Sequence, residues 1–140
     1  MPRFSKSSKE RLATCVEPLQ RIFNVVIERF DCTIVEGHRA EAAQNKAHDE
    51  GKSQLRWPDG NHNETPSKAT DAAPYYSHIG VVWNHPDPRV VRENATLFAG
   101  YVLGVAAMMA IDLRWGGDWN GNWDTADNNF DDLWHFEIIE

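Results

Sequence analysis

Two histidines and one aspartate have side chains and surroundings that suit a metal ion. His62 and Asp71 belong to the polar stretch HNETPSKATD, and His135 belongs to the C-terminal run DDLWHFEIIE. Taken singly, either histidine is typical of a hydrogen-bonded structural residue. Taken with the aspartate, they could form a catalytic zinc site, which needs three protein ligands and one open position for water. Two imidazoles and one carboxylate leave a net positive charge, which lowers the pKa of that water and polarises a carbonyl.

A carboxylate that does not bind the metal could move the proton in such a site. Asp132 shortly precedes His135, at the junction that we expect between a polar loop and the last strand. If the strand holds His135 rigidly, Asp132 would enter the same cavity from the loop beside it. A carboxylate in that position can act as a general base.

Oxygen-bearing side chains alternate in the loop DWNGNWD and suggest a second metal site. Asp118, Asn120, Asn122 and Asp124 follow the first half of an EF-hand calcium loop, whose oxygen ligands recur at alternate positions. The glutamate that ends such a loop is missing, because Asn129 stands there. Two interpretations stay open, a calcium site and a solvated turn.

Three motifs in this order resemble the LAS metallopeptidases, which comprise D-alanyl-D-alanine carboxypeptidases and phage L-alanyl-D-glutamate endopeptidases. HNETPSKATDAAPY resembles their first zinc motif in the form H-N-x-x-P-S-x-A-x-D, and DDLWHFEI resembles the second, [DE]-x-x-H-x-E. The resemblance implies that His62, Asp71 and His135 bind zinc and that Asp132 is the catalytic base. RWGGDW is also similar to a block of the family, without an assigned role.

VEGHRAEAAQ resembles the family's G-x-R-x-x-x-x-Q segment, which implies that Arg39 and Gln44 lie beside the substrate. A guanidinium can bind a carbonyl or carboxylate in two places and could hold an oxyanion. A surface ion pair is the alternative for Arg39. The first motif departs from its commoner form, which places the histidine where Glu64 stands here, so Glu64 is an alternative ligand to His62.

The resemblance implies a zinc-dependent peptidoglycan hydrolase, closest to phage endolysins, with a Hedgehog/DD-peptidase-like fold. We expect cleavage of the L-alanyl-D-glutamate bond of stem peptides. The alternatives are a D-alanyl-D-alanine carboxypeptidase with the same zinc site and a non-catalytic wall-binding module. Asp132 argues against the last. The acidic residues before it would repel the terminal carboxylate of a carboxypeptidase substrate: Asp118, Asp124, Asp127 and Asp131.

The composition limits the partners. A chain of 140 residues predicts a single domain, a peptidase domain spanning residues 1–140. Its net charge of -7 disfavours nucleic acid as a partner. The N-terminus lacks the apolar core of a signal peptide, and the two cysteines suit a reducing compartment. We therefore expect a monomer that accumulates in the host cytoplasm and reaches bacterial peptidoglycan after the membrane is opened.

The periodicity predicts an α+β fold, with helices packed on a small antiparallel sheet. Ser7 and Glu10 predict a capping box for the first helix, and Pro18 breaks or restarts it. The uncharged stretch at 97–111 is too short to cross a bilayer, so we expect a buried helix whose Gly100 and Gly104 allow close packing. The other expected elements are helices at 19–30, 39–51 and 87–111, strands at 32–37, 69–76 and 133–139, a strand beginning at 113, and a long loop at 52–68.

Overall fold

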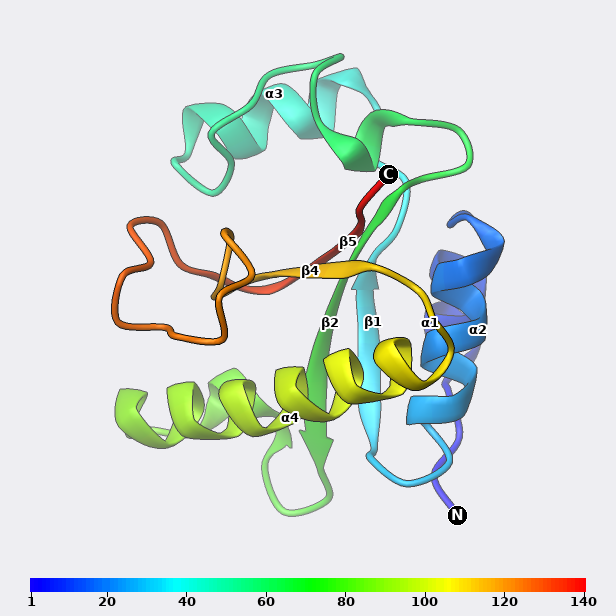
Figure 1. Ribbon diagram of the computed structural model, residues 1–140, viewed down its shortest axis with the longest axis vertical. Coiled ribbons are helices and arrows are strands. Elements are labelled where there is room, and N and C mark those ends of the chain that lie inside the picture. Colours follow the sequence, from blue (N-terminus) through cyan, green and yellow to red (C-terminus); the bar gives the residue numbers. More distant parts are fainter.

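The computed structural model describes all residues, 1–140, and shows helices packed on one antiparallel sheet (Figure 1). The helices are α1 (Lys6–Leu12), α2 (Glu17–Val26), α3 (Glu41–Asp49) and α4 (Pro88–Met108). The strands are β1 (Cys32–Glu36), β2 (Ala69–Tyr76), β3 (Gly80–Val81), β4 (Leu113–Gly116) and β5 (Asp132–Ile138). Two short 3₁₀ turns complete the list, η1 (Asn61–Asn63) and η2 (Val82–Asn84). The predicted α+β class is confirmed.

The sheet brings distant parts of the chain together in the order β1-β2-β5-β4, with β3 paired to the far end of β2. Every neighbouring pair is antiparallel. The C-terminal strand β5 therefore lies in the middle of the sheet, between β2 and β4. A central strand is held by hydrogen bonds on both edges, which makes it a rigid support for functional side chains.

The core fills the space between the sheet and the helices α2 and α4. Phe23 of α2 and Phe98 of α4 both pack edge-on against Phe136 of β5, with ring centroids 5.6 and 6.0 Å apart. All three rings are fully buried. Burying a side chain of this size contributes roughly 1.5–3 kcal/mol to folding. β5 is thus anchored by the core on its inner face. α3 and residues 52–68 lie beyond the end of the sheet at which β1 ends and β2 begins (Figure 1).

Several boundaries differ from the sequence prediction. The predicted capping box is wrong, because Ser5 caps α1 and its hydroxyl accepts a hydrogen bond from the backbone N–H of Ser8. α2 ends at Val26 and not at residue 30, since the N–H groups of Glu28 and Arg29 bond to carbonyls three residues back. Such bonds tighten the chain into turns that keep helix-like spacing. The short strand β3 has too few residues to show a periodic pattern.

The expected burial of α4 on nearly all sides is also wrong. Leu97 is 63% exposed and Met108 is 89% exposed. A β-carbon added at Gly100 or Gly104 would meet no atom within 4 Å, so these glycines permit no close packing in the folded chain. Only one side of α4 lies on the sheet. None of the helices combines the length and the apolar character needed to span a bilayer.

Candidate functional site

Three side chains that are distant in sequence converge in the structure. One atom each of His62, Asp71 and His135 lies within 4.8 Å of the other two. Nε2 of His62 lies 3.2 Å from Oδ1 of Asp71 and 3.2 Å from Nδ1 of His135. The same aspartate oxygen lies 3.5 Å from His135 Nδ1. We refer to these three residues as the metal cluster.

The hydrogen bonds on the outer side of each imidazole leave its inner nitrogen free for a cation. His62 Nδ1 lies 2.7 Å from the carbonyl oxygen of Gly37, and His135 Nε2 lies 2.7 Å from a carboxylate oxygen of Glu137. Those oxygens only accept, so the outer nitrogens carry the hydrogen atoms. In neutral imidazoles the two inner nitrogens then point lone pairs at each other and at a carboxylate. Three converging acceptors fit a bound cation.

The pKa values of His135 and Asp71 also indicate that the cluster suits a cation. Burial lowers the pKa of His135, but hydrogen bonds to Asp71 and Glu137 outweigh it and raise the pKa to about 9. Burial raises the pKa of Asp71, yet the two histidines outweigh burial and hold it well below its usual range. The cluster therefore favours a positive charge between the ligand atoms. Metal binding would displace a bound proton.

The sheet register positions two of the cluster residues. Asp71 of β2 and His135 of β5 are direct partners across the ladder. His62 is brought to them by η1, which is tied down by a 2.7 Å hydrogen bond from the N–H of Arg39 to the carbonyl of His62. Side chains of paired residues on adjacent strands lie close together on one face of the sheet. The cluster is therefore preformed by backbone pairing.

Asp132 lies at the start of β5, beside the cluster but outside it. Its Oδ2 is 3.9 Å from His135 Nδ1. The ladder between β4 and β5 shifts register between Trp115 and Gly116, whose partners are Phe136 and Asp132. Such an irregularity breaks strict alternation and re-aims a side chain. Burial, followed by the charge on Asp71, raises the pKa of Asp132 to about 6, which suits a group that exchanges protons near neutral pH.

Arg39 precedes α3 and reaches Asp71 of the metal cluster with its guanidinium. Its Nη2 donates to Oε2 of Glu36 at 2.8 Å and to Oδ2 of Asp71 at 3.3 Å. Burial lowers the pKa of Arg39, but Glu36 and Asp71 outweigh it and raise the pKa, so the guanidinium stays charged. Arg39 therefore does make an ion pair, but a largely buried one beside the metal cluster, since its side chain is only 11% exposed. Its predicted role towards the substrate stays a prediction.

Gln44 is almost fully buried but belongs to the lining of a cavity beside the metal cluster. It lies on α3 and is 1% exposed. Its Oε1 accepts from Nη1 of Arg39 at 3.0 Å, and its Nε2 donates to the carbonyl of Leu55. Asn63 also donates to Oε1 of Gln44 and to the carbonyl of Arg39. The structure thus makes Gln44 a support for Arg39, and a direct substrate contact stays a prediction.

Glu64 is exposed and lies outside the metal cluster, so the structure brings His62 and not Glu64 to Asp71 and His135. None of the other histidines joins the cluster: His38, His48, His78 and His85.

Glu137 and its partners were not assigned any role from the sequence. The Glu137 carboxylate accepts from His135, from Nδ2 of Asn61 at 2.9 Å and from Nη1 of Arg114 at 3.2 Å. Arg114 and Glu137 are cross-strand partners on β4 and β5. A carboxylate that binds the outer nitrogen of a metal-binding histidine fixes its ring and raises its basicity. The spacing of His135 and Glu137 on a strand is the signal that could have identified the pair.

Trp119 was another unassigned residue, although it ends the RWGGDW block. Its indole lies 5.3 Å from the imidazole of His135, at an interplanar angle of 41°, and its Nε1 donates to the carbonyl of Phe130. It covers one face of the imidazole and ties together the two ends of the loop between β4 and β5.

The loop at 117–131 contains the four residues of the predicted calcium site. Asp118 is 6% exposed, and its Oδ1 is the one buried side-chain oxygen or nitrogen without a hydrogen-bond partner. Its Oδ2 accepts from the N–H of Trp123, which has a φ of 66°. Asn120, Asn122 and Asp124 each accept from the N–H two residues ahead. Asp127 accepts from the side-chain amides of both asparagines.

The fold and this group of side chains define the class of protein: an α+β protein with a site able to hold one metal ion. Residues 1–139 match the family model of the phage L-alanyl-D-glutamate peptidases. The L-alanyl-D-glutamate peptidase of Escherichia phage T5 is 36% identical over 129 residues, which cover 89% of this chain and 87% of that protein. The chain belongs to the phage L-alanyl-D-glutamate peptidase family.

A solved structure supports the fold. The crystal structure of the Serratia marcescens L-Ala D-Glu endopeptidase ChiX matches with a TM-score of 0.70 and covers 99% of this chain and 91% of that one. The sequence identity is 21%, so this match bears on the fold alone. It agrees with helices packed on a small antiparallel sheet.

Proposed function

We propose that the chain is a zinc-dependent endopeptidase that cuts the L-alanyl-D-glutamate bond of peptidoglycan stem peptides. The observation that carries this proposal is the metal cluster, in which three acceptor atoms converge and both outer imidazole nitrogens are already engaged. Two imidazoles and a carboxylate are a common ligand set of hydrolytic zinc. The names of the family and of its T5 member support the choice of bond.

His62, Asp71 and His135 would hold the metal. A zinc ion held there would supply a Lewis acid that can polarise a carbonyl and activate water. Asp132 would accept the proton of the attacking water and deliver it to the leaving amine, for which its raised pKa of about 6 is suited. Arg39 orients Asp71 and would steady the oxyanion or the glutamate carboxylate of the substrate.

The choice of residues is tested by zinc content. His62→Ala and His135→Ala proteins should lose stoichiometric zinc, because each removes one of three ligands. Glu64→Ala is the matched control, since Glu64 is exposed and outside the cluster. Full zinc in either histidine variant, or its loss in the Glu64 variant, would overturn the ligand set.

The choice of bond is tested by the products of purified peptidoglycan. Labelling of new amino termini followed by mass spectrometry of the muropeptides should identify N-terminal glutamate. Released D-alanine as the main product would instead support the D-alanyl-D-alanine carboxypeptidase. A folded, zinc-loaded protein that produces neither would support a non-catalytic wall-binding module.

Two further parts of the proposal concern the loop and the setting. The unpartnered oxygen of Asp118 supports calcium binding by the loop at 117–131. Asp118, Asn120, Asn122 and Asp124 would supply oxygen ligands. We also propose that the chain acts as a monomer and reaches the cell wall from the host cytoplasm once the membrane is opened, as expected of a phage endolysin.

A further inference from the structure

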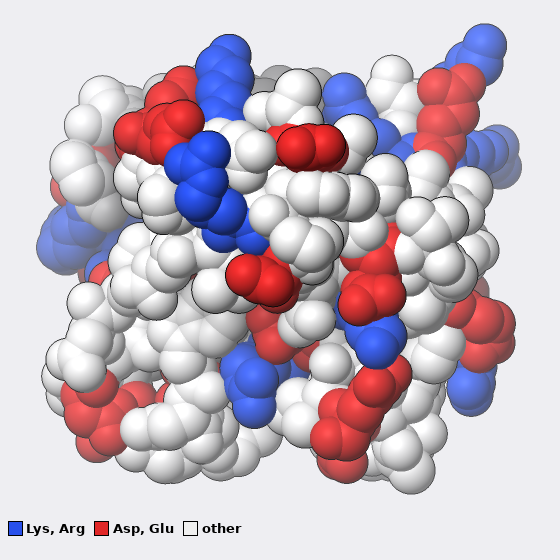
Figure 2. Space-filling model, turned by 90° about the horizontal axis from the view of Figure 1, so that it is seen from above, with Lys and Arg blue, Asp and Glu red and all other residues white.

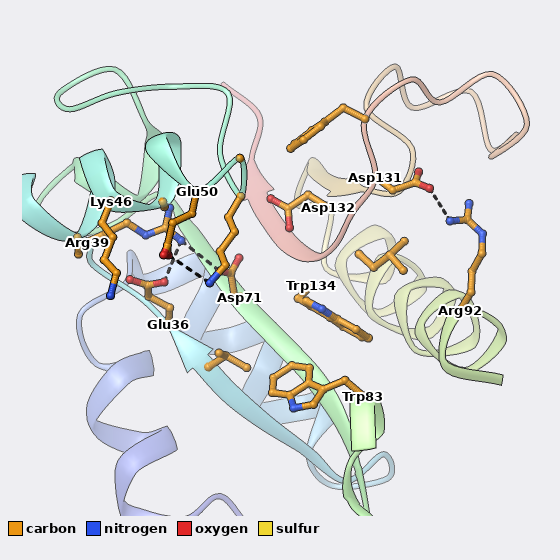
Figure 3. A pocket seen from close by; sticks show the side chains of 17 residues that line it. Glu36, Arg39, Lys46, Glu50, Asp71, Trp83, Arg92, Asp131, Asp132 and Trp134 are labelled. Carbon is orange, nitrogen blue, oxygen red and sulfur yellow. Dashed lines mark hydrogen bonds and ion pairs between the residues drawn. The ribbon is translucent and has the colours of Figure 1, made fainter. Parts of the chain in front are cut away.

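A groove of about 830 Å³ leads away from the metal cluster. Arg39, Asp71 and Asp132 line it at the catalytic end, and Trp83 and Trp134 line it farther along (Figure 3). Its volume falls in the range of about 300–1,000 Å³ that is usual for ligand sites. The proposed chemistry uses only the catalytic end, which leaves the rest of the groove available to another part of the substrate.

The two tryptophans form a rigid aromatic surface in this groove. Trp83 belongs to η2 and Trp134 to β5, and their rings meet edge to face with centroids 5.4 Å apart at an angle of 69°. Trp83 nevertheless remains 44% exposed. Large aromatic side chains are stabilised by burial. The ring of Trp83 is held by the indole of Trp134 and is open to the groove, so it presents an apolar face to a ligand.

The charges along the groove are mostly neutralised by one another. Arg92 of α4 donates to Asp131 at 2.5 Å, and Lys52 lies 3.5 Å from Glu50. Lys46 is the one lining cation without an ion pair. Figure 2 shows acidic and basic residues intermixed on the face seen from above, not separated into fields of one sign. Paired charges offer both donors and acceptors, which suits an uncharged ligand rich in hydroxyl and amide groups.

We propose that this groove binds the sugar ring that carries the stem peptide, an N-acetylated hexosamine of the glycan strand. The inference rests on the proposed function. In peptidoglycan the L-alanine is amide-linked to the lactyl group of that sugar, so the ring lies one residue from the bond to be cut. The C–H face of the ring would stack on Trp83 and Trp134, and its hydroxyl and acetamido groups would meet the ion pairs on the groove walls.

The two cavities at the metal cluster would then divide the substrate between them. A second cavity of about 290 Å³ shares Arg39, Phe130 and Asp132 with the groove and includes His62 and Trp119. The larger, aromatic groove would take the sugar and L-alanine, and the smaller cavity would take D-glutamate. The sugar subsite would therefore favour a stem peptide still attached to the glycan over a free one.

The test compares two substrates with the same peptide. One is a disaccharide tetrapeptide, and the other is the tetrapeptide with an acetyl group in place of the sugars. We expect the zinc-loaded protein to have a kcat/KM about tenfold higher for the first, the size of a stacking contact on an aromatic side chain. Trp83→Ala should reduce that ratio toward one, and Trp83→Phe should largely keep it.

Tyr75→Ala is the matched control, because Tyr75 is 42% exposed but does not line the groove. It should leave the ratio unchanged. Equal kcat/KM values for both substrates in the wild type would overturn the proposal. A loss in Trp83→Ala that is the same for both substrates would also overturn it, and would place peptide in the groove.

A binding measurement separates failure of this proposal from failure of the proposed function. The peptide-free disaccharide should bind the wild-type protein in a titration followed by NMR, and bind Trp83→Ala at least about fivefold more weakly. If neither peptide is cut but the disaccharide binds in this way, the endopeptidase assignment fails and the sugar site stands. If the peptides are cut and the disaccharide does not bind, the sugar site fails alone.

Discussion

His62, Asp71 and His135 lie on paired strands and an adjoining 3₁₀ turn, whereas the predicted calcium ligands lie in an irregular loop between β4 and β5. In the cluster on the sheet, both outer imidazole nitrogens are engaged and the inner atoms converge. In the loop, a single oxygen of Asp118 lacks a partner, and the other side-chain oxygens accept bonds from the loop itself.

The metal cluster is thus positioned by the fold, whereas the predicted calcium site in the loop would be completed only by a cation. Ladder pairing sets the position of Asp71 opposite His135 before any metal arrives. Oxygens already engaged in turns must keep or exchange those bonds when a cation binds. We therefore expect changes near the sheet to affect zinc and catalysis strongly, and changes in the loop to have small effects.

The largest effect is expected from Asp132→Asn. This residue is beside the cluster but is not a proposed ligand, so zinc and fold should be retained. Activity should fall by roughly 10²–10⁴, the usual contribution of a general base. Steady-state kinetics together with zinc content would check this. Near-normal turnover would remove Asp132 from the mechanism and make Glu137 the next residue to examine.

The Glu137→Gln variant tests whether the support of His135 matters. Glutamine keeps the size of the side chain but weakens the bond to Nε2 of His135, which the carboxylate accepts at 2.7 Å. Loss of such a partner typically costs about 10–100-fold in metal affinity or activity. Zinc affinity should be measured by competition with a chelator. Glu140→Gln, at an exposed position, is the control. Unchanged affinity in Glu137→Gln would mean that the strand alone orients the imidazole.

The sequence was sufficient for the parts of this site that local motifs specify. His62, Asp71 and His135 were predicted from two short motifs, and β2 was predicted with its observed bounds. The Arg114–Glu137 pair could not be predicted, because it depends on the register between β4 and β5.

Properties that depend on packing were missed for a related reason. The exposed face of α4 follows from which side of the helix meets the sheet, and an apolar, uncharged stretch does not reveal that. The contact between Trp83 and Trp134 likewise joins segments far apart in the chain, and depends on how η2 is placed beside β5.

A pH-dependent prediction follows from the raised pKa of His135. In the metal-free chain this pKa is about 9, above the ordinary value of 6.5. A raised pKa contributes stability that is fully present below pH 6.5 and is lost as the pH rises towards 9. We expect the metal-free protein to lose on the order of 1–3 kcal/mol across that window. Zinc in the metal cluster would occupy Nδ1 of His135, the nitrogen that faces Asp71, so the zinc-loaded protein should not show this loss.

Thermal or urea unfolding at several pH values, with and without zinc, would measure this effect. The metal-free His135→Gln variant should have a flatter profile, since it lacks the titrating group. A decline of equal size in the zinc-loaded protein would assign the effect to groups outside the cluster.

The smallest expected effect concerns calcium and the loop. Sites of weak extracellular type have dissociation constants of about 10⁻⁴–10⁻³ M. Calcium at about 1 mM would then stabilise the protein by roughly 0.4–1.4 kcal/mol, a Tm increase of a few degrees for a domain of this size.

Asp118→Asn should abolish the increase, because it removes charge at the unpartnered oxygen and keeps the acceptor for Trp123. Asp112→Asn, an exposed position outside the loop, should retain it. Because Trp119 joins this loop to His135, calcium should also raise activity modestly at saturating zinc. If neither Tm nor activity responds at millimolar calcium, the loop is plain turn structure, and the buried oxygen of Asp118 must be satisfied by water.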